Sequence, residues 1–555
     1  MNRRSFMAAA AAVLAPRGNA QQYSATAGNV LELSFRSAKP YADPFNELEL
    51  EVTFTSESGA RHSVPAYWAG EQNWRVRYAP PSPGRYNFLT HCSDASNQQL
   101  HGQEGTLEVA PYGGSHPLYL HGALRVSSNR RYLEHADGTP FFWLGDTWWM
   151  GLTKRLRWPE DFQYLASDRA QKGFTVIQIV AGLFPDMDSF DPRGTNEAGF
   201  AWQPGYSRIN PAFFDMADLR IQHLIDRGLT PCILGCWGYY LPKIGIRKMK
   251  QHWRYLIARW GAFPVVWCLA GEGTMPYYLS SRPDQDRSEQ RTGWTEIARY
   301  VRAADPFRRP ITIHPSRTAR ESVDDPAVLD FNMLQTGHSG RKSYANTIRT
   351  LTNEYAAEPR MPVVNGEVCY EGIFEASREE VQRFLFWSNM LSGAAGFTYG
   401  ANGIWQVNTE QEPFGPSPHG RTWGNVPWNQ AAAYPGSRQL GLGASLLRRY
   451  QWWRFEPHPE WVEPHWTPQN YEQPYAAGIP RQLKFIYLPG GWDPPKAIQL
   501  EDGLNYRAFL WEPSTGRRID LGAPRPLNGA WRMETLPATR DWVVVLENPS
   551  LPAYA

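Results

Sequence analysis

Apolar and polar residues alternate along two separate parts of the chain, and a different pattern lies between them. Near the N-terminus, Leu48–Phe54 and Trp74–Tyr78 change between apolar and polar at every position, and the turn-forming segment Pro80–Gly84 follows the second run. A period of two residues is typical of a strand with one buried face. Short strands at this spacing, with no helical period between them, favour a β-sandwich. The sequence therefore predicts an N-terminal β-sandwich over residues 25–112.

Between residues 117 and 450, short apolar runs alternate with amphipathic helical segments. In residues 213–228, apolar side chains recur at the three- and four-residue spacing of a helix, and Gly228 ends the segment. Eight of the short runs are candidate strands: Phe141–Gly145, Phe174–Val180, Thr230–Leu234, Val265–Ala270, Pro310–His314, Asp330–Gln335, Pro362–Asn365 and Ala395–Tyr399. Eight strand–helix repeats predict a (β/α)8 barrel, or TIM barrel, whose chemistry sits at the carboxyl ends of the strands.

The alternating pattern returns in the last part of the chain. Tyr506–Trp511 and Arg518–Leu521 predict a hairpin, and Trp542–Leu546 predicts a final strand. We expect a second β-sandwich over residues 475–555, connected to the barrel by the Trp- and Pro-rich segment 451–474. The predicted fold is multidomain: a central (β/α)8 TIM barrel flanked by N-terminal and C-terminal β-sandwich domains.

The first twenty residues have the pattern of an export signal. Arg3 and Arg4 precede an Ala-rich apolar stretch that ends at Ala15, and small residues before Gln21 offer a cleavage site. Arg3 and Arg4, followed after one residue by Phe6 and Met7, look like a twin-arginine signal. We therefore expect residues 1–20 to be a signal peptide and the protein to be exported to the periplasm or beyond. No other apolar run reaches the length of a membrane span.

Composition narrows the function mainly by exclusion. The chain has 555 residues with 56 basic and 54 acidic side chains, and no charged block stands out, so nothing favours nucleic-acid binding. The five cysteines are odd in number and fall mostly in predicted buried strands, so we expect free thiols. Cys232 and Cys236 have no matching His or Cys pair, and we expect neither a metal nor an organic cofactor. The 24 tryptophans suit either a Trp-rich core or flat surfaces for sugar rings.

Two glutamates end predicted strands at positions where catalytic groups gather. Glu272 follows the fourth predicted strand and Glu367 follows the seventh. A glycosidase needs two carboxyl groups, one to protonate the leaving oxygen and one to attack the anomeric carbon or stabilise its charge. The alternative for each glutamate is a buried ion pair with an arginine. Because both lie on the predicted rim, we expect them to be the catalytic pair, about 5–5.5 Å apart, with net retention of configuration.

Polar and aromatic residues also stand at the other strand ends. Each has a structural alternative, such as a helix cap or a core side chain, but their convergence on one rim favours substrate binding. The predicted substrate-binding residues are Asp146, Trp148, Gln178, Trp237, His314, Gln335, His338, Tyr399, Asn402 and Trp405.

Several of these strand ends resemble a known family. The segments Pro140–Trp148, His314–Pro315, Gln335–His338 and Val364–Glu371 resemble the apiosidase-like glycoside hydrolase domain, a relative of the large clan of retaining (β/α)8 glycosidases. Phe45–Ala110 is similar to the sandwich often found before such barrels. Asp541–Leu546 is similar to a C-terminal domain type catalogued as collagen-binding.

The resemblance implies that Glu367 is the nucleophile on the seventh strand and that the carboxyl group on the fourth strand is the acid/base. Relatives often have Gly-Gly-Asp at that fourth-strand position, whereas this chain has Ala270, Gly271 and Glu272. Because Glu is one methylene longer than Asp, the resemblance does not determine which sugar is the substrate. We therefore expect an exported glycoside hydrolase that acts on plant-type or other complex glycans. The alternatives are an endo-acting polysaccharidase on the same barrel and a non-catalytic carbohydrate- or matrix-binding protein.

Overall fold

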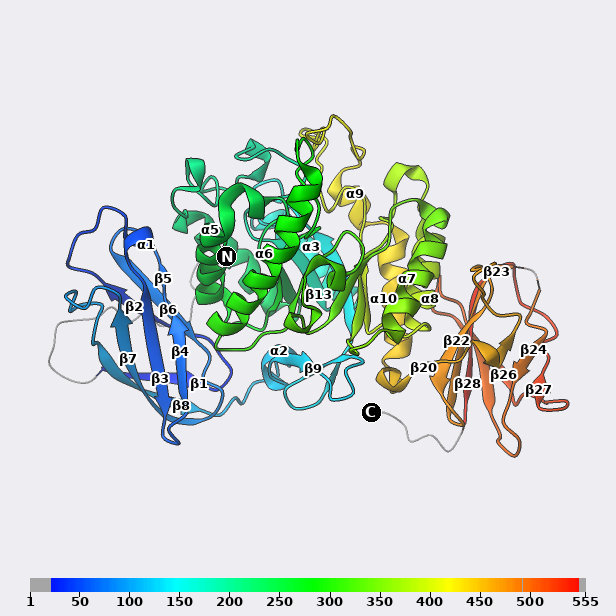
Figure 1. The fold of residues 1–555 in the computed structure, drawn as a ribbon. Helices are drawn as coiled ribbons and strands as arrows, with labels where there is room; N and C mark the ends of the chain where they lie inside the picture. The colour runs from blue at the N-terminus through cyan, green and yellow to red at the C-terminus, as the bar shows by residue number, and fades with distance from the viewer. Residues whose placement is uncertain (1–20, 492, 549–555) are drawn as a thin grey trace.

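The computed structural model describes residues 21–491 and 493–548, so the predicted signal peptide lies outside the described residues. Three parts follow one another across the molecule in Figure 1: a β-rich domain, a barrel surrounded by helices, and a second β-rich domain. None of the helices in the described residues is long and apolar enough to cross a membrane.

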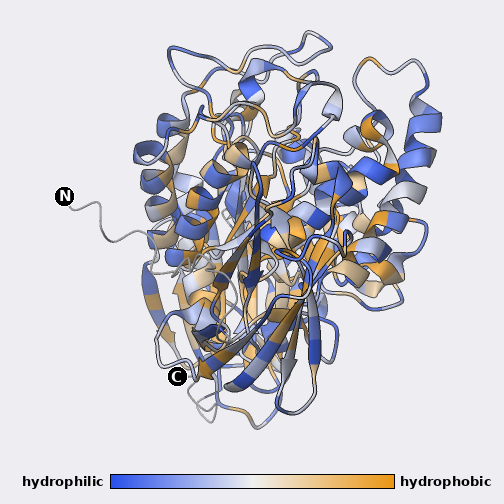
Figure 2. Ribbon diagram, turned by 90° about the vertical axis from the view of Figure 1, so that its left-hand side faces the viewer, coloured by the Kyte–Doolittle hydropathy of each residue, from blue (hydrophilic) through white to orange (hydrophobic). Residues whose placement is uncertain are grey.

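The N-terminal part is a pair of sheets, as the alternation predicts. One sheet has the order β1-β8-β7-β3-β4 and the other has the order β2-β6-β5. Their strands are β1 (Gln21–Thr26), β2 (Leu31–Arg36), β3 (Leu50–Ser56), β4 (Arg61–Pro65), β5 (Tyr67–Trp68), β6 (Asn73–Tyr78), β7 (Gly84–Cys92) and β8 (Glu104–Ala110), and a short helix α1 (Pro44–Glu47) lies between β2 and β3. Buried and more exposed positions alternate along β7 and β8. Figure 2 shows the corresponding changes between hydrophilic and hydrophobic residues along strands.

All eight predicted barrel strands are present, and they form one sheet of order β16-β15-β14-β13-β12-β19-β18-β17. They are β12 (Trp143–Trp148), β13 (Val176–Val180), β14 (Thr230–Leu234), β15 (Val266–Cys268), β16 (Ile311–Thr312), β17 (Asn332–Gln335), β18 (Val363–Glu367) and β19 (Gly396–Tyr399). Neighbouring strands in this order pair in parallel. The two end strands meet where the Asp330 N–H donates to the Ile311 oxygen over 2.8 Å. The central fold is therefore a (β/α)8 barrel.

Helices alternate with these strands and cover the barrel (Figure 1). They are α3 (Glu160–Gln171), α4 (Pro211–Asp226), α5 (Tyr240–Trp260), α6 (Pro283–Ala304), α7 (Tyr344–Ala356), α8 (Glu379–Met390), α9 (Trp428–Ala432) and α10 (Pro435–Leu447). In α4, the side chains of Phe213, Ala217, Ile221 and Leu224 are all buried, as the helical period predicts. A helix α2 (Pro117–Leu120) and a small sheet of β9 (Leu124–Val126), β10 (Leu133–His135) and β11 (Pro140–Phe141) lead into the barrel.

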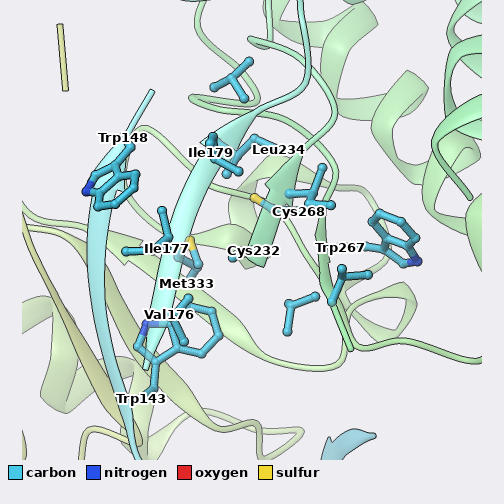
Figure 3. Close-up of a cluster of buried hydrophobic side chains, with 14 of the residues drawn as sticks. Trp143, Trp148, Val176, Ile177, Ile179, Cys232, Leu234, Trp267, Cys268 and Met333 are labelled. Atoms are coloured by element: carbon cyan, nitrogen blue, oxygen red, sulfur yellow. The ribbon is translucent and has the colours of Figure 1, made fainter. Parts of the chain in front are cut away.

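The strands of the barrel are buried along their whole length because both of their faces are covered. Figure 3 shows aromatic, aliphatic and sulfur-containing side chains gathered among β12, β13, β14, β15 and β17. Cys232 and Cys268 belong to this group, and all five cysteines are free and buried. Burial raises the pKa of Cys232 well above its ordinary value, so this thiol stays neutral and packs as an apolar group.

The C-terminal part again consists of two sheets, of order β20-β22-β23-β28-β25-β26 and β21-β24-β27. The strands are β20 (Glu456–Pro457), β21 (Val462–Glu463), β22 (Tyr475–Ile479), β23 (Leu483–Gly491), β24 (Ala497–Gln499), β25 (Arg507–Trp511), β26 (Arg518–Gly522), β27 (Ala530–Trp531) and β28 (Arg540–Glu547). The predicted hairpin is confirmed, because β25 and β26 pair antiparallel.

Buried ion pairs connect both outer domains to the barrel. Arg77 of the first sandwich lies 2.5 Å from Asp218 of α4. On the other side, Arg383 of α8 donates to both oxygens of Asp541 over 2.7 and 2.9 Å. Breaking such a pair by removing one partner leaves an unpaired buried charge, so these contacts fix where the domains sit on the barrel.

Candidate active site

A cavity of about 490 Å³ opens at the carboxyl ends of the barrel strands. Loops that follow seven of the eight strands supply its walls, and β16 is the exception. The lining residues are Trp149, Pro185, Asp186, Trp237, Glu272, Tyr278, Gln335, His338, Glu367, Tyr370, Ile373, Trp405 and Trp423. A wider hollow of about 1330 Å³ lies between residues 154–161 and 409–429, and none of the predicted site residues lines it.

Gln335 joins the two glutamates at the bottom of this cavity. Its Nε2 donates to Glu272 Oε1 over 3.1 Å and to Glu367 Oε1 over 3.2 Å. Because both oxygens contact one nitrogen, they are at most about 6.3 Å apart. The angle of about 120° between the two N–H bonds of an amide places them nearer about 5.5 Å. The two carboxyl groups therefore face one another across a space that holds one reacting atom.

Glu367 is the last residue of β18 and lies between two histidines. Nε2 of His338 is 2.9 Å from Glu367 Oε1, and Nε2 of His314 is 3.0 Å from Glu367 Oε2, though away from the line of an ideal hydrogen bond. Burial by itself would raise the pKa of Glu367, but the two histidines outweigh burial and lower that pKa to about 2. In return Glu367 raises the pKa of His338 against the effect of burial. Glu367 is therefore an ionised carboxylate near neutral pH.

Glu272 lies in a less polar environment. Its Oε2 accepts from Nε1 of Trp237 over 3.3 Å, and no arginine or lysine pairs with it among the described residues. Burial and the nearby charge of Glu367 raise the pKa of Glu272. Gly271 permits this arrangement, because a Cβ at that position would lie 2.2 Å from the Trp237 ring. A carboxyl group with a raised pKa can hold a proton and donate it.

The backbone of Glu272 contacts His314, which in turn contacts Glu367. Glu272 has a left-handed conformation, with φ of 42°, and its N–H donates to Nδ1 of His314 over 3.4 Å. An imidazole nitrogen that accepts a hydrogen bond carries no proton, so the proton of neutral His314 is on Nε2. That nitrogen faces Glu367. The strand end that carries one carboxyl group thus selects the histidine tautomer that stabilises the other.

Six of the predicted residues line the cavity: Trp237, Glu272, Gln335, His338, Glu367 and Trp405. Three others lie directly behind its wall. His314 contacts Glu367 from below, and Asn402 Nδ2 donates to the Trp423 oxygen over 2.6 Å. Gln178 Nε2 donates to the Gly366 oxygen over 2.7 Å, next to Glu367. These three support the site without lining it.

The structure does not bring Asp146, Trp148 and Tyr399 to the cavity. Asp146 forms a fully buried ion pair with Arg169 of α3 over 2.6 Å and accepts from Trp148 Nε1 over 2.9 Å. Tyr399 donates to Glu371 over 2.5 Å. Successive side chains of a strand point to opposite faces, so Asp146 and Trp148 share the face toward the helices, and Trp149 lines the cavity.

Sequence reasoning missed five cavity residues with side chains able to bind a sugar: Trp149, Asp186, Tyr278, Tyr370 and Trp423. Tyr370 stacks on His338 with ring centroids 4.9 Å apart and accepts from Trp149 Nε1 over 2.9 Å. The alternation in β12 would have found Trp149 if its inward register had been known. The other residues stand on long loops, where no period in the sequence indicates which side chain turns inward.

Asp186 is a third carboxyl group in the cavity wall. Its oxygens accept from Ser417 Oγ and, over 3.1 Å, from Trp423 Nε1. Burial raises the pKa of Asp186, while the hydrogen bonds to Ser417 and Tyr278 act against that shift. This residue therefore joins three loops, those after β13, β15 and β19, at one point of the mouth.

Comparison with known proteins agrees with this geometry. Residues 127–454 match the family model of the apiosidase-like catalytic domain, and residues 26–93 match a domain of unknown function, DUF5060. No curated protein matches the chain.

Solved structures share the fold at low sequence identity. One, described as a glycoside hydrolase, is 22% identical over 78% of this chain and 98% of its own, with a TM-score of 0.63. A family 5 glycoside hydrolase from Bacteroides vulgatus is 21% identical over 78% of this chain and 94% of its own, with a TM-score of 0.66. A third protein, from the same organism and classed with glycoside hydrolases, is 16% identical over 95% of this chain and 100% of its own, with a TM-score of 0.69. The chain belongs to the apiosidase-like family and is a glycoside hydrolase.

Proposed function

We propose that the protein is an exported, retaining glycosidase that removes a terminal sugar from plant-type or other complex glycans. Glu367 is the nucleophile and Glu272 is the acid/base. The observation that carries this proposal is the single amide of Gln335, which holds both carboxyl groups close together while their pKa values move in opposite directions. Pairs of titratable groups whose environments separate their pKa values are the pattern of an acid and a nucleophile.

The distance supports retention. Retaining enzymes have carboxyl groups about 5–5.5 Å apart, whereas inverting enzymes leave about 6.5–9.5 Å for a water molecule. The two oxygens that contact Gln335, at about 5.5 Å from one another, fit the first range. Glu367 attacks the anomeric carbon as Glu272 protonates the departing oxygen, and a glycosyl ester forms on Glu367. Glu272, now a carboxylate, takes a proton from water, and the oxygen of that water displaces Glu367 from the sugar.

The surrounding residues fit these steps. His314 and His338 keep Glu367 ionised. The amide of Gln335 can donate a hydrogen bond to whichever of the two carboxyl groups carries the negative charge at each step. Indole and phenol rings supply flat apolar surfaces for the C–H faces of a sugar, and Trp149, Trp237 and Trp405 provide them here. Asp186 can accept hydrogen bonds from sugar hydroxyls.

The shape of the cavity favours exo action. Loops after seven strands surround it, and Trp149 of the wall packs against the buried His314 with ring centroids 5.2 Å apart. Such walls suit the end of a glycan better than its middle. The endo-acting alternative requires the substrate to pass on both sides of the glutamates. Export by the twin-arginine route remains part of the proposal because of Arg3 and Arg4.

The test is a panel of 4-nitrophenyl glycosides together with end-labelled pectic and hemicellulosic oligosaccharides. We expect hydrolysis of one sugar series, with monosaccharide released from the non-reducing end. Internal cleavage fragments from the labelled oligosaccharides would favour the endo-acting alternative. No hydrolysis of any member would count against the substrate class.

A further inference from the structure

Several strained backbone positions lie on the loops that follow the barrel strands. Among residues other than glycine, Asp186, Glu272, Phe374 and Val407 have φ values of 60°, 42°, 50° and 50°. A left-handed conformation is unfavourable for a residue with a Cβ, and such residues persist where the surrounding structure and function hold them. Asp186 and Glu272 carry carboxyl groups that line the cavity. Phe374 takes no part in the hydrolysis steps, so its strain needs another explanation.

Phe374 is also strongly exposed. Its side chain is 61% exposed, although the residue before it, Ile373, lines the cavity. A phenyl ring stabilises a folded protein mainly when it is buried away from water. The exposed ring of Phe374 therefore contributes little free energy of folding to offset its strained backbone. Exposed large apolar side chains close to a cavity mark surfaces that a ligand covers.

The ring of Phe374 stands at the mouth of the cavity next to a fixed partner. Its centroid is 5.8 Å from that of Trp423, which lines the cavity. Trp423 is held at both ends, because its Nε1 donates to Asp186 and its backbone oxygen accepts from Asn402. On the loop after β15, Leu279 is 63% exposed and follows the cavity residue Tyr278. The loops that follow the two glutamates thus each carry an exposed apolar side chain.

We propose that Phe374, backed by Trp423, binds the leaving group of the substrate, and that this leaving group carries a ring. The inference rests on the proposed function: the terminal sugar occupies the cavity beside Glu367, so the rest of the glycan leaves through the mouth. The next sugar ring places its C–H face against the phenyl ring there. An aromatic aglycone fits the same surface. Phe374 is therefore a determinant of specificity for the leaving group and not a catalytic residue.

The test compares two substrates that share one sugar, the one found with the glycoside panel. The 4-nitrophenyl glycoside has a ring in its leaving group, whereas the glycosyl fluoride has a single atom. We expect Phe374→Ala to lower kcat/KM about tenfold for the aryl glycoside, mainly through KM, and to leave the fluoride within about twofold. Phe374→Tyr, which keeps the ring, should restore the aryl value. Leu527→Ala, at an exposed leucine of the C-terminal domain, is the matched control and should change neither.

A second measurement separates binding from packing. Phe374→Gly removes the strained Cβ, so its melting temperature should equal or exceed that of the wild type while the aryl substrate is still bound poorly. A clear fall in melting temperature, or equal losses on both substrates, would overturn the inference and leave the proposed function intact. If the wild type hydrolyses neither substrate, the proposed function fails and this inference fails with it.

Discussion

Glu272 and Glu367 are the same residue type at the ends of two strands of one barrel, yet their surroundings shift their pKa values in opposite directions. Glu367 is buried and Glu272 is half-buried, and both accept a hydrogen bond from Gln335. Glu367 has two further imidazole partners, whereas Glu272 has the Nε1 of Trp237. Burial acts on both pKa values in the same direction, so the partners decide the difference. The neighbouring donors, rather than the carboxyl group itself, move the two pKa values apart.

The largest effect should come from removing the ionised member of the pair. Glu367→Gln should lower kcat/KM at least about 10,000-fold on every substrate, because no carboxylate remains to attack the anomeric carbon. Glu371→Gln is the matched control. Glu371 is four residues further on and has a pKa raised by burial to about 7, but its partners are Tyr399 and the Gly436 N–H, outside the cavity. Comparable losses in the two variants would contradict the distinction.

A loss that depends on the substrate should follow from changing the other glutamate. Glu272→Gln should lower kcat/KM by about 100- to 10,000-fold for oligosaccharides, whose leaving groups need a proton. The glycosyl fluoride needs none and should lose far less. The alkaline limb of the pH profile, which reports the raised pKa of Glu272, should disappear in this variant. If the alkaline limb stays, another group is the acid.

A smaller change should come from one histidine. His338→Phe keeps the ring that stacks on Tyr370 but removes the donor to Glu367. The pKa of Glu367 should then rise from its low value, so the acidic limb of kcat/KM should move to higher pH. A hydrogen bond to a charged group is worth about 1.5–3 kcal/mol, which corresponds to a shift of about one to two pH units. An unchanged acidic limb would show that His338 does not stabilise the carboxylate.

Much of the fold followed from periodicity, because alternation and helical spacing are local properties of the chain. All eight barrel strands and the hairpin of β25 and β26 were found, with ends displaced by up to a few residues. The residue types at the strand ends also predicted that Glu272, Glu367, Gln335 and His338 lie near one another, and all four line the cavity.

The direction of side chains could not be read in the same way. Barrel strands are buried on both faces, so the pattern does not say which parity points inward. Asp146 and Trp148 were therefore expected at the rim, although they face Arg169 and the helix layer. Asp186 and Trp423 meet from loops far apart in sequence, and that contact depends on the closed barrel.

The configuration of the first-formed sugar tests the central claim most directly. Proton NMR of the hydrolysis mixture, recorded before mutarotation, identifies the anomer that leaves the enzyme. A covalent intermediate on Glu367, resolved by water that Glu272 activates, predicts the same anomer as the substrate. An inverted product would contradict the account, because it would require a water molecule, and not Glu367, to attack the anomeric carbon.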